Sequence, residues 1–224
     1  MDIAPLLHIG PGVTALIGGG GKTTLMDTLA AELRRRGTVI VTTSTHIRRP
    51  ADYPVLTSGD EKAVSAALAR SGAVCVAAES VEGKLTAPAL PFEALSALAD
   101  FVLVEADGAK RLPLKAHAPH EPAIPPEANQ TICVVGASGF GQPIRDAAHR
   151  PELYARLAGV EEADPITPET EAAVLKTERL HHCLFVNQAD TPEDMKTVKQ
   201  LAALLDGPIL AGSLQKGAYF KCLS

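Results

Sequence analysis

Aromatic residues make up only 4% of this 224-residue chain, and tryptophan is missing altogether. A core must therefore be built from Ala, Val, Leu and Ile, and a hydrophobic content of 46% supplies enough of them for one generous domain. Positive charge is also scarce, because the formal net charge is -5. A nucleic-acid surface needs an excess of Lys and Arg on one face, so we expect no nucleic-acid partner.

Paired cysteines and long apolar runs are lacking as well. Cys75, Cys133, Cys183 and Cys222 include no CxxC pair, which argues against a zinc knuckle or a disulfide framework. The first residues lack the basic start and apolar stretch of a signal peptide. No run approaches the roughly 18 uncharged apolar residues that span a bilayer. These absences predict a cytoplasmic protein with reduced thiols and no membrane partner.

The chain does contain short apolar runs that alternate with helical patterns. Strands are predicted at 13–17, 39–43, 74–77, 101–105, 132–135, 183–187 and 209–211. Helices are predicted at 22–36, 60–70, 92–99, 151–158, 168–177 and 193–205. Continuously apolar strands separated by helices predict a mostly parallel sheet with helices on both faces. The expected fold class is therefore α/β, a three-layer sandwich in which residues 1–224 form a single domain.

A long segment without clear periodicity interrupts this alternation. Residues 106–130 contain five prolines and directly follow a predicted strand. Loops of this length in compact domains are usually functional, and ligands of parallel sheets bind where strands end. We predict that this segment is a lid or a substrate loop.

A glycine-rich loop lies between the first predicted strand and the first predicted helix. Glycines allow backbone N–H groups to turn toward phosphate oxygens, and a helix N-terminus adds a favourable dipole. In this arrangement Lys22 would reach the β- and γ-phosphates, and the Thr23 hydroxyl would bind Mg²⁺. Leu16 stands where the usual motif begins with glycine, so the loop is a shortened P-loop. The predicted nucleotide-binding residues are Gly18, Gly19, Gly20, Gly21, Lys22, Thr23 and Thr24.

Two carboxylates end the strand predicted at 101–105. Such a strand end places an acid beside a P-loop, where it can hold Mg²⁺ directly or through water. Asp107 is the first choice and Glu105 the second, since strand alternation puts both on one face. An ordinary Asp-Gly turn is the alternative interpretation. With Lys22, these two acids complete the predicted catalytic set.

Asn187, Gln188 and Asp190 follow a late strand and resemble the Asn-Lys-x-Asp motif that recognises guanine. An aspartate there accepts hydrogen bonds from guanine donors that adenine does not have. Gln188 replaces the lysine that packs along the base. Asp190 could instead cap the next helix, just before Pro192.

Other polar residues are candidates for contacts with substrate or with the γ-phosphate. A metal site at His117, His120 and Glu121 is disfavoured, because intervening prolines prevent the helix that would align them. The end of the second strand is either a γ-phosphate contact or an ordinary strand end. The candidates are Thr43, Thr45, His46, Lys110, Lys115, His117, His120 and Glu121.

Taken together, these motifs resemble those of the YqeC family. The resemblance rests on residues 17–24, 42–46, 102–109, 112–122, 135–136, 149–151 and 166–168. The family implies a P-loop protein that assists the maturation of a selenium-containing molybdenum cofactor. The implied protein partner is an apo molybdenum hydroxylase or a cofactor-assembly protein.

These features predict a P-loop NTPase fold and a Mg²⁺-dependent nucleoside triphosphate hydrolase. Its nucleotide is ATP or GTP, with GTP slightly favoured by Asn187 and Asp190. One alternative is a small-molecule kinase whose acceptor is held by Lys110, Lys115 and His120. Another is a nucleotide-gated binding module with little turnover.

Overall fold

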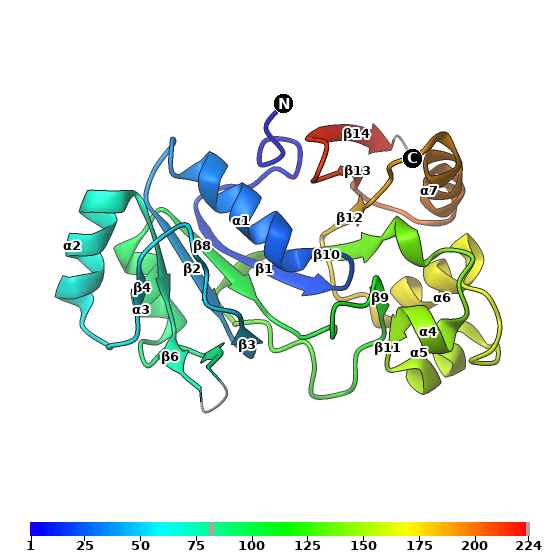
Figure 1. Ribbon diagram of the computed structural model, residues 1–224, viewed down its shortest axis with the longest axis horizontal. Helices are drawn as coiled ribbons and strands as arrows, with labels where there is room; N and C mark the ends of the chain where they lie inside the picture. Colours follow the sequence, from blue (N-terminus) through cyan, green and yellow to red (C-terminus); the bar gives the residue numbers. More distant parts are fainter. Residues whose placement is uncertain (81–82, 223–224) are drawn as a thin grey trace.

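A computed structural model describes residues 1–80 and 83–222 of the chain. Its main strands are β1 (Gly12–Gly18), β2 (Val39–Thr43), β4 (Val55–Leu56), β5 (Ala73–Val76), β8 (Phe101–Glu105), β10 (Ala128–Gly136), β12 (Cys183–Asn187), β13 (Ile209–Ser213) and β14 (Ala218–Cys222). They form one nine-stranded sheet in the order β14-β13-β12-β10-β1-β8-β2-β5-β4 (Figure 1). Neighbouring strands are parallel except for the antiparallel pair of β13 and β14.

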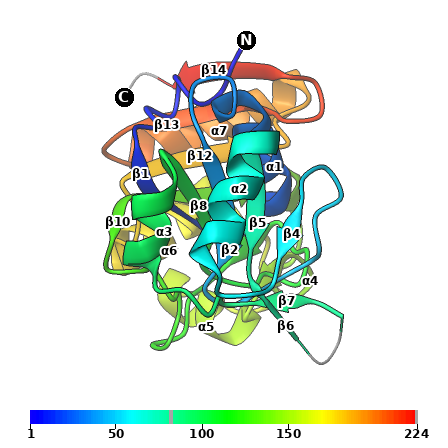
Figure 2. The same ribbon diagram turned by 90° about the vertical axis from the view of Figure 1, so that its left-hand side faces the viewer.

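Helices cover both faces of this sheet. They are α1 (Lys22–Leu33), α2 (Glu61–Ser71), α3 (Phe92–Leu98), α4 (Ile144–Ala147), α5 (Pro151–Ala158), α6 (Pro168–Glu178) and α7 (Pro192–Leu204). One face carries α1 and the N-terminal segment, while α2 and α3 cover one half of the other face and α4 to α7 its second half (Figures 1 and 2). The expected mostly parallel three-layer α/β fold is therefore confirmed.

Strand alternation divides the core between these faces. Leu16 belongs to the cluster under α1, and the next residue, Ile17, belongs to the cluster under α4 to α7. Successive side chains of a strand point to opposite faces, so a continuously apolar β1 can serve both clusters. Both side chains are fully buried. This packing fixes the carboxyl end of β1, from which the glycine-rich loop leaves the sheet.

Some boundaries differ from the sequence-based prediction. Helix α1 ends at Leu33 rather than at residue 36, because residues 34–36 form a turn closed by the Gly37 N–H on the Leu33 carbonyl at 3.1 Å. The prediction missed β14, an edge strand with a mixed burial pattern in which Phe220 is 51% exposed. An edge strand pairs on one side only, so its sequence need not be continuously apolar.

Short strands surround the ends of the central strands. β3 (His46–Ile47), β7 (Leu85–Thr86) and β6 (Ala78–Glu79) form a small sheet in that order. β9 (Leu114–Lys115) pairs in parallel with β11 (Ala148–His149). The segment 106–130 thus contains β9 and the first residues of β10, and its residues 114–117 are buried. Whether it serves as a lid stays a prediction.

Among the described residues, no helix is both long enough and apolar enough to cross a bilayer.

Candidate functional site

The glycine-rich loop is fixed to its surroundings by its first three glycines. Their N–H groups (residues 18–20) donate in turn to the Asp107 carboxylate at 2.9 Å, the Val134 carbonyl at 2.8 Å and the Leu112 carbonyl at 3.1 Å. A Cβ atom on Gly20 would lie 2.3 Å from the backbone nitrogen of Gly136, and Gly20 has a φ of +68°. No other residue fits there without a backbone shift. The loop is therefore tightly packed.

The next four N–H groups are available to a ligand. Those of residues 21–24 have no acceptor among residues 1–80 and 83–222. They stand where α1 begins, and Leu25 is the first residue whose N–H closes a helical turn, on the Gly21 carbonyl at 2.9 Å. Consecutive free N–H groups at a helix N-terminus form a binding site for an anion.

Lys22 lies folded against its own loop. Its ammonium donates to the Gly18 carbonyl and forms an ion pair with Asp107 at 2.9 Å. Only 5% of the side chain is exposed. To reach a phosphate above the loop, Lys22 would exchange the Gly18 carbonyl for a phosphate oxygen.

Glu105 is the carboxylate that faces the helix start. The Thr23 hydroxyl donates to it at 3.0 Å. Burial raises the pKa of Glu105, although the Lys22 charge and the Thr23 hydrogen bond act in the opposite direction. The pair joins a hydroxyl to a carboxylate, and hard oxygen ligands of this kind suit Mg²⁺.

Asp107 lies beside the glycine-rich loop and is surrounded by cations. It is fully buried and pairs with Lys22, Lys115 and His117, at distances of 2.9, 3.4 and 2.7 Å. Burial alone would raise its pKa, but the His117 hydrogen bond and the two lysine charges outweigh burial and hold the pKa well below the usual range. Glu105, and not Asp107, therefore adjoins the Thr23 hydroxyl, and which of the two acids serves Mg²⁺ stays a prediction.

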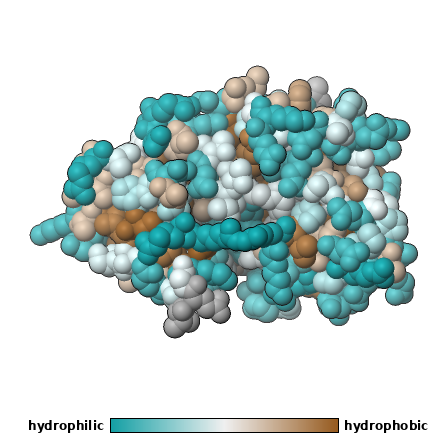
Figure 3. Space-filling view, in the orientation of Figure 1, coloured by the Kyte–Doolittle hydropathy of each residue, from teal (hydrophilic) through white to brown (hydrophobic). Residues whose placement is uncertain are grey.

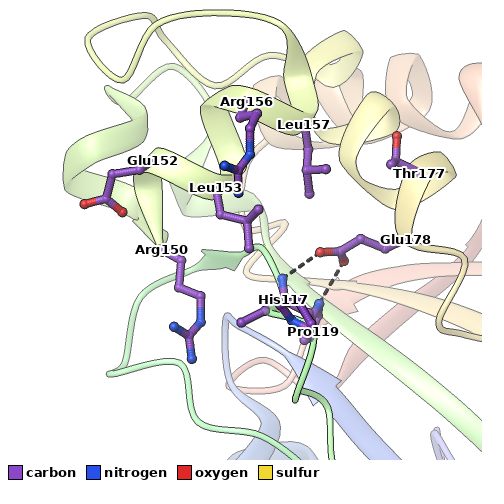
Figure 4. A pocket seen from close by; sticks show the side chains of 10 residues that line it. His117, Pro119, Arg150, Glu152, Leu153, Arg156, Leu157, Thr177 and Glu178 are labelled. Carbon is purple, nitrogen blue, oxygen red and sulfur yellow. Dashed lines mark hydrogen bonds and ion pairs between the residues drawn. The ribbon is translucent and has the colours of Figure 1, made fainter.

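His117 joins Asp107 to helix α6. Its Nε2 lies 2.7 Å from Asp107. Its Nδ1 lies 2.8 Å from Glu178, a contact that Figure 4 marks with a dashed line. The His117 backbone N–H also donates to Glu178, at 2.6 Å. Burial lowers the pKa of His117, but hydrogen bonds to the two carboxylates outweigh burial and raise it. A chain of contacts thus runs from Lys22 through Asp107 and His117 to Glu178.

The remaining candidates of the 106–130 segment divide into buried and exposed residues. The Lys115 side chain is fully buried between Asp107 and Glu121, the latter at 2.8 Å, so it cannot hold an acceptor without leaving them. Glu121 also pairs with Arg150 at 3.0 Å. His120 is exposed. Within the described residues no group of three His, Cys, Asp or Glu could hold a metal ion.

Thr43, Thr45 and His46 lie at the end of β2. The fully buried Thr43 donates its hydroxyl to the Glu105 carbonyl at 2.8 Å and accepts from the Thr45 N–H at 2.9 Å. These contacts support the strand-end interpretation for the two threonines. His46 lines the cavity described next.

A cavity of about 880 Å³ opens above the glycine-rich loop. Of the predicted residues, its lining includes Gly19, Gly20, Gly21, Lys22, Thr23, Thr24, His46, Glu105, Lys110 and Glu121. Gln188 also lines the cavity, together with Arg48, Lys84, Arg111 and His149, which were not predicted. Arg111 follows Lys110 directly, so a pair of cations after Asp-Gly was visible in the sequence. Arg48 is likewise followed directly by Arg49, so a second pair of cations was visible just after the end of the second strand.

Asn187 and Asp190 lie beside a smaller cavity of about 260 Å³. The Asn187 amide donates to the Gly20 carbonyl at 2.8 Å and accepts from the Leu214 N–H at 3.0 Å. Asn187 thereby joins the glycine-rich loop to the end of β13. The helix cap of α7 is Thr191, whose side chain accepts from the Asp194 N–H, so the alternative in which Asp190 caps the helix is wrong.

A strand, a glycine-rich loop that offers free N–H groups, and a helix beside a strand-end carboxylate define a P-loop protein. The family model described as "YqeC protein" matches residues 14–152. The chain is 33% identical over 160 residues to "Uncharacterized protein YqeC" of Escherichia coli (strain K12), a match that covers 67% of this chain and 62% of that protein. The chain therefore belongs to the YqeC family, and it spans less than two thirds of this relative.

One solved structure also resembles the chain. It is the signal recognition particle 54 kDa protein of Aeropyrum pernix K1 in complex with GDP, with 16% sequence identity and a TM-score of 0.39. The match covers 95% of this chain and 44% of that protein. A likeness at this level does not bear on function.

Proposed function

We propose that this chain binds a purine nucleoside triphosphate with Mg²⁺ and hydrolyses it. The observation that carries the proposal is the row of free N–H groups of residues 21–24 at the start of α1. They can receive phosphate oxygens, and Lys22 can stabilise the charge that develops on the terminal phosphate. Asp107 then acts as a positioning residue, because it holds both the Gly18 N–H and Lys22.

The fit of Mg²⁺ rests on Thr23 and Glu105. Their side-chain oxygens lie 3.0 Å apart and face the same cavity as the free N–H groups. Mg²⁺ in nucleotide sites takes one or two protein oxygens and completes its shell with water and phosphate. Thr23 would bind the ion directly and Glu105 directly or through water. The bound ion would neutralise charge on the phosphates.

We further propose that the base occupies the 260 Å³ cavity and that guanine is favoured. Asp190 lines this cavity, its side chain is 39% exposed, and its nearest cation is Lys216 at 3.6 Å. The carboxylate is therefore available to the N1 and N2 donors of guanine. Gln188 carries no charge, and its side-chain oxygen accepts a hydrogen bond from the Ser138 hydroxyl at 2.6 Å. We therefore expect guanine to be preferred over adenine about tenfold, which corresponds to roughly one hydrogen bond.

Membership of the YqeC family supports a further proposal about the cellular role. In this role, hydrolysis assists the maturation or insertion of a selenium-containing molybdenum cofactor. The protein partner would be an apo molybdenum hydroxylase or a cofactor-assembly protein.

Phosphate release from GTP and from ATP, measured with Mg²⁺ and without any acceptor, tests this proposal. We expect release from both nucleotides, with GTP preferred about tenfold in kcat/KM. Asp190→Ala should remove the preference, and Asp206→Ala, which changes an exposed aspartate beyond α7, should keep it. Release that requires an added acceptor would contradict hydrolysis. An unchanged preference in Asp190→Ala would contradict the base assignment.

A further inference from the structure

Three cations of the large cavity have no partner among the residues that the structure describes. Arg48, Lys110 and Arg111 line the cavity, and no ion pair or hydrogen bond joins their side chains to any residue in 1–80 or 83–222. All three are exposed. The formal charge of the whole chain is -5, so this local excess of positive charge is a specific feature of the cavity. Figure 3 shows hydrophilic side chains that extend across the middle of the face seen in Figure 1.

The acids of the cavity do not neutralise these cations. Glu121 already pairs with Lys115 at 2.8 Å and with Arg150 at 3.0 Å. Glu105 accepts a hydrogen bond from the Thr23 hydroxyl, and Lys22 is the cation whose charge lowers its pKa. His149 also lines the cavity. Burial lowers its pKa, and the positive charges of Lys115, Arg150 and Lys110 lower it further, while Glu121 acts in the opposite direction.

Two of the cations stand on a rigid turn. Lys110 and Arg111 have φ values of +49° and +65°, a left-handed conformation that side-chain-bearing residues rarely adopt. The Leu112 N–H closes the turn on the Ala109 carbonyl at 2.8 Å, and the Leu112 carbonyl accepts from the Gly20 N–H at 3.1 Å. The turn is therefore attached to the glycine-rich loop itself. Strained backbone that is held in this way is typical of functional positions.

The cavity also has room beyond the nucleotide phosphates. Small-molecule sites commonly measure about 300 to 1,000 Å³, and this one measures about 880 Å³ without the separate 260 Å³ cavity proposed for the base. Four free N–H groups, Lys22 and a metal ion suffice for the triphosphate. The three unpaired cations then remain for another anion.

We propose that Arg48, Lys110 and Arg111 form a binding site for a second, phosphate-bearing small molecule beside the nucleotide phosphates. The assignment rests on the proposed nucleotide function, which it extends by naming the class of the second ligand. Phosphate is favoured over a carboxylate because two arginines and a lysine match its charge and its several acceptor oxygens. Of Lys110, Lys115 and His120, which the sequence analysis assigned to a second substrate, only Lys110 lines this cavity.

The test is a calorimetric titration with inorganic phosphate. The protein is first saturated with Mg²⁺ and a non-hydrolysable GTP analogue, so that the P-loop is occupied. We expect one phosphate to bind per chain. Arg48→Ala and Arg111→Ala should each weaken phosphate binding about tenfold or more, as the loss of a charge-assisted hydrogen bond does. The control Arg70→Ala, which removes an exposed arginine on α2, should have no effect.

Four results would overturn this assignment. Phosphate could fail to bind the loaded parent, or bind the arginine variants as tightly as the parent. Malonate could compete as well as phosphate, which would exclude a phosphate site. The variants could weaken a triphosphate analogue but not GDP, which would place the cations on the nucleotide's own terminal phosphate.

Failure of the nucleotide proposal has a separate signature. If the parent binds no nucleotide, phosphate is titrated into Lys22→Ala, in which the P-loop lysine is gone. Binding that persists there and is lost in Lys22→Ala/Arg111→Ala supports the second site. Binding that is absent from Lys22→Ala, or insensitive to Arg111, rejects it.

Discussion

Replacing His117 by glutamine should destabilise the protein strongly. The imidazole lies between Asp107 at 2.7 Å and Glu178 at 2.8 Å, with only 3% of its side chain exposed. Its loss leaves two largely buried carboxylates without a shared cation, and removing one partner of a buried ion pair costs about 3 to 5 kcal/mol. Asp107 keeps its lysines and Glu178 keeps the backbone N–H of residue 117, so we expect the low end, about 3 kcal/mol.

The same contacts make stability depend on pH. The folded protein raises the pKa of His117 above its unfolded value of about 6.5. The stabilisation by the imidazolium is therefore fully present below about pH 6.5 and is lost as pH rises through the folded pKa. Relative to the parent, the free energy of unfolding of His117→Gln should be lowered most at about pH 6 and less at about pH 9.

Urea unfolding of the parent and His117→Gln at these two pH values provides the measurement. His120→Gln is the matched control, because His120 is exposed three residues away. If His117→Gln lowers the free energy of unfolding by less than about 0.5 kcal/mol, the range of ordinary surface substitutions, the reasoning is refuted. An equal cost at both pH values would show that His117 is not charged in the fold.

Two further predictions concern carboxylates. Glu105→Gln should raise the Mg²⁺ concentration needed for half-maximal triphosphate binding about 10- to 100-fold, as changes next to metal ligands do, whereas Asp107→Asn should mainly lower the urea midpoint. If Asp107→Asn raises this Mg²⁺ concentration more than Glu105→Gln does, Asp107 and not Glu105 is the acid that serves the metal. Burial raises the pKa of Glu171 to about 7, so folding loses stability as pH rises from about 4.5 through 7. Glu171→Gln, which can still accept from Tyr154, should abolish that loss in urea unfolding, and an unchanged profile would contradict the buried protonated acid.

The sequence predicted most of the fold because the signals were local. A continuously apolar β1, a glycine-rich loop and a periodic helix predict a phosphate site without tertiary information. Glu105 and Asp107 were both predicted as site residues. The sequence could not tell which carboxylate contacts Thr23 and which contacts His117. These contacts join residues 82 and 10 positions apart, respectively.

The missed residues needed tertiary structure. Arg48 and Arg111 are ordinary surface arginines in the sequence and become a pair only because they line one cavity. Glu178 is the last residue of α6, and only the packing of α6 brings it to His117. Side chains that act through long-range contacts leave no periodic signal in the sequence.

The central claim is that the loop from Gly18 to Thr24 binds the phosphates of a nucleoside triphosphate. Calorimetric titration of the parent and of Lys22→Ala with GTP and Mg²⁺ tests this claim most directly, with circular dichroism to verify that both proteins are folded. We expect saturable binding by the parent and loss of binding in the folded Lys22→Ala protein. Equal affinity of the two folded proteins for GTP, or no binding of GTP or ATP by the parent, would contradict the claim.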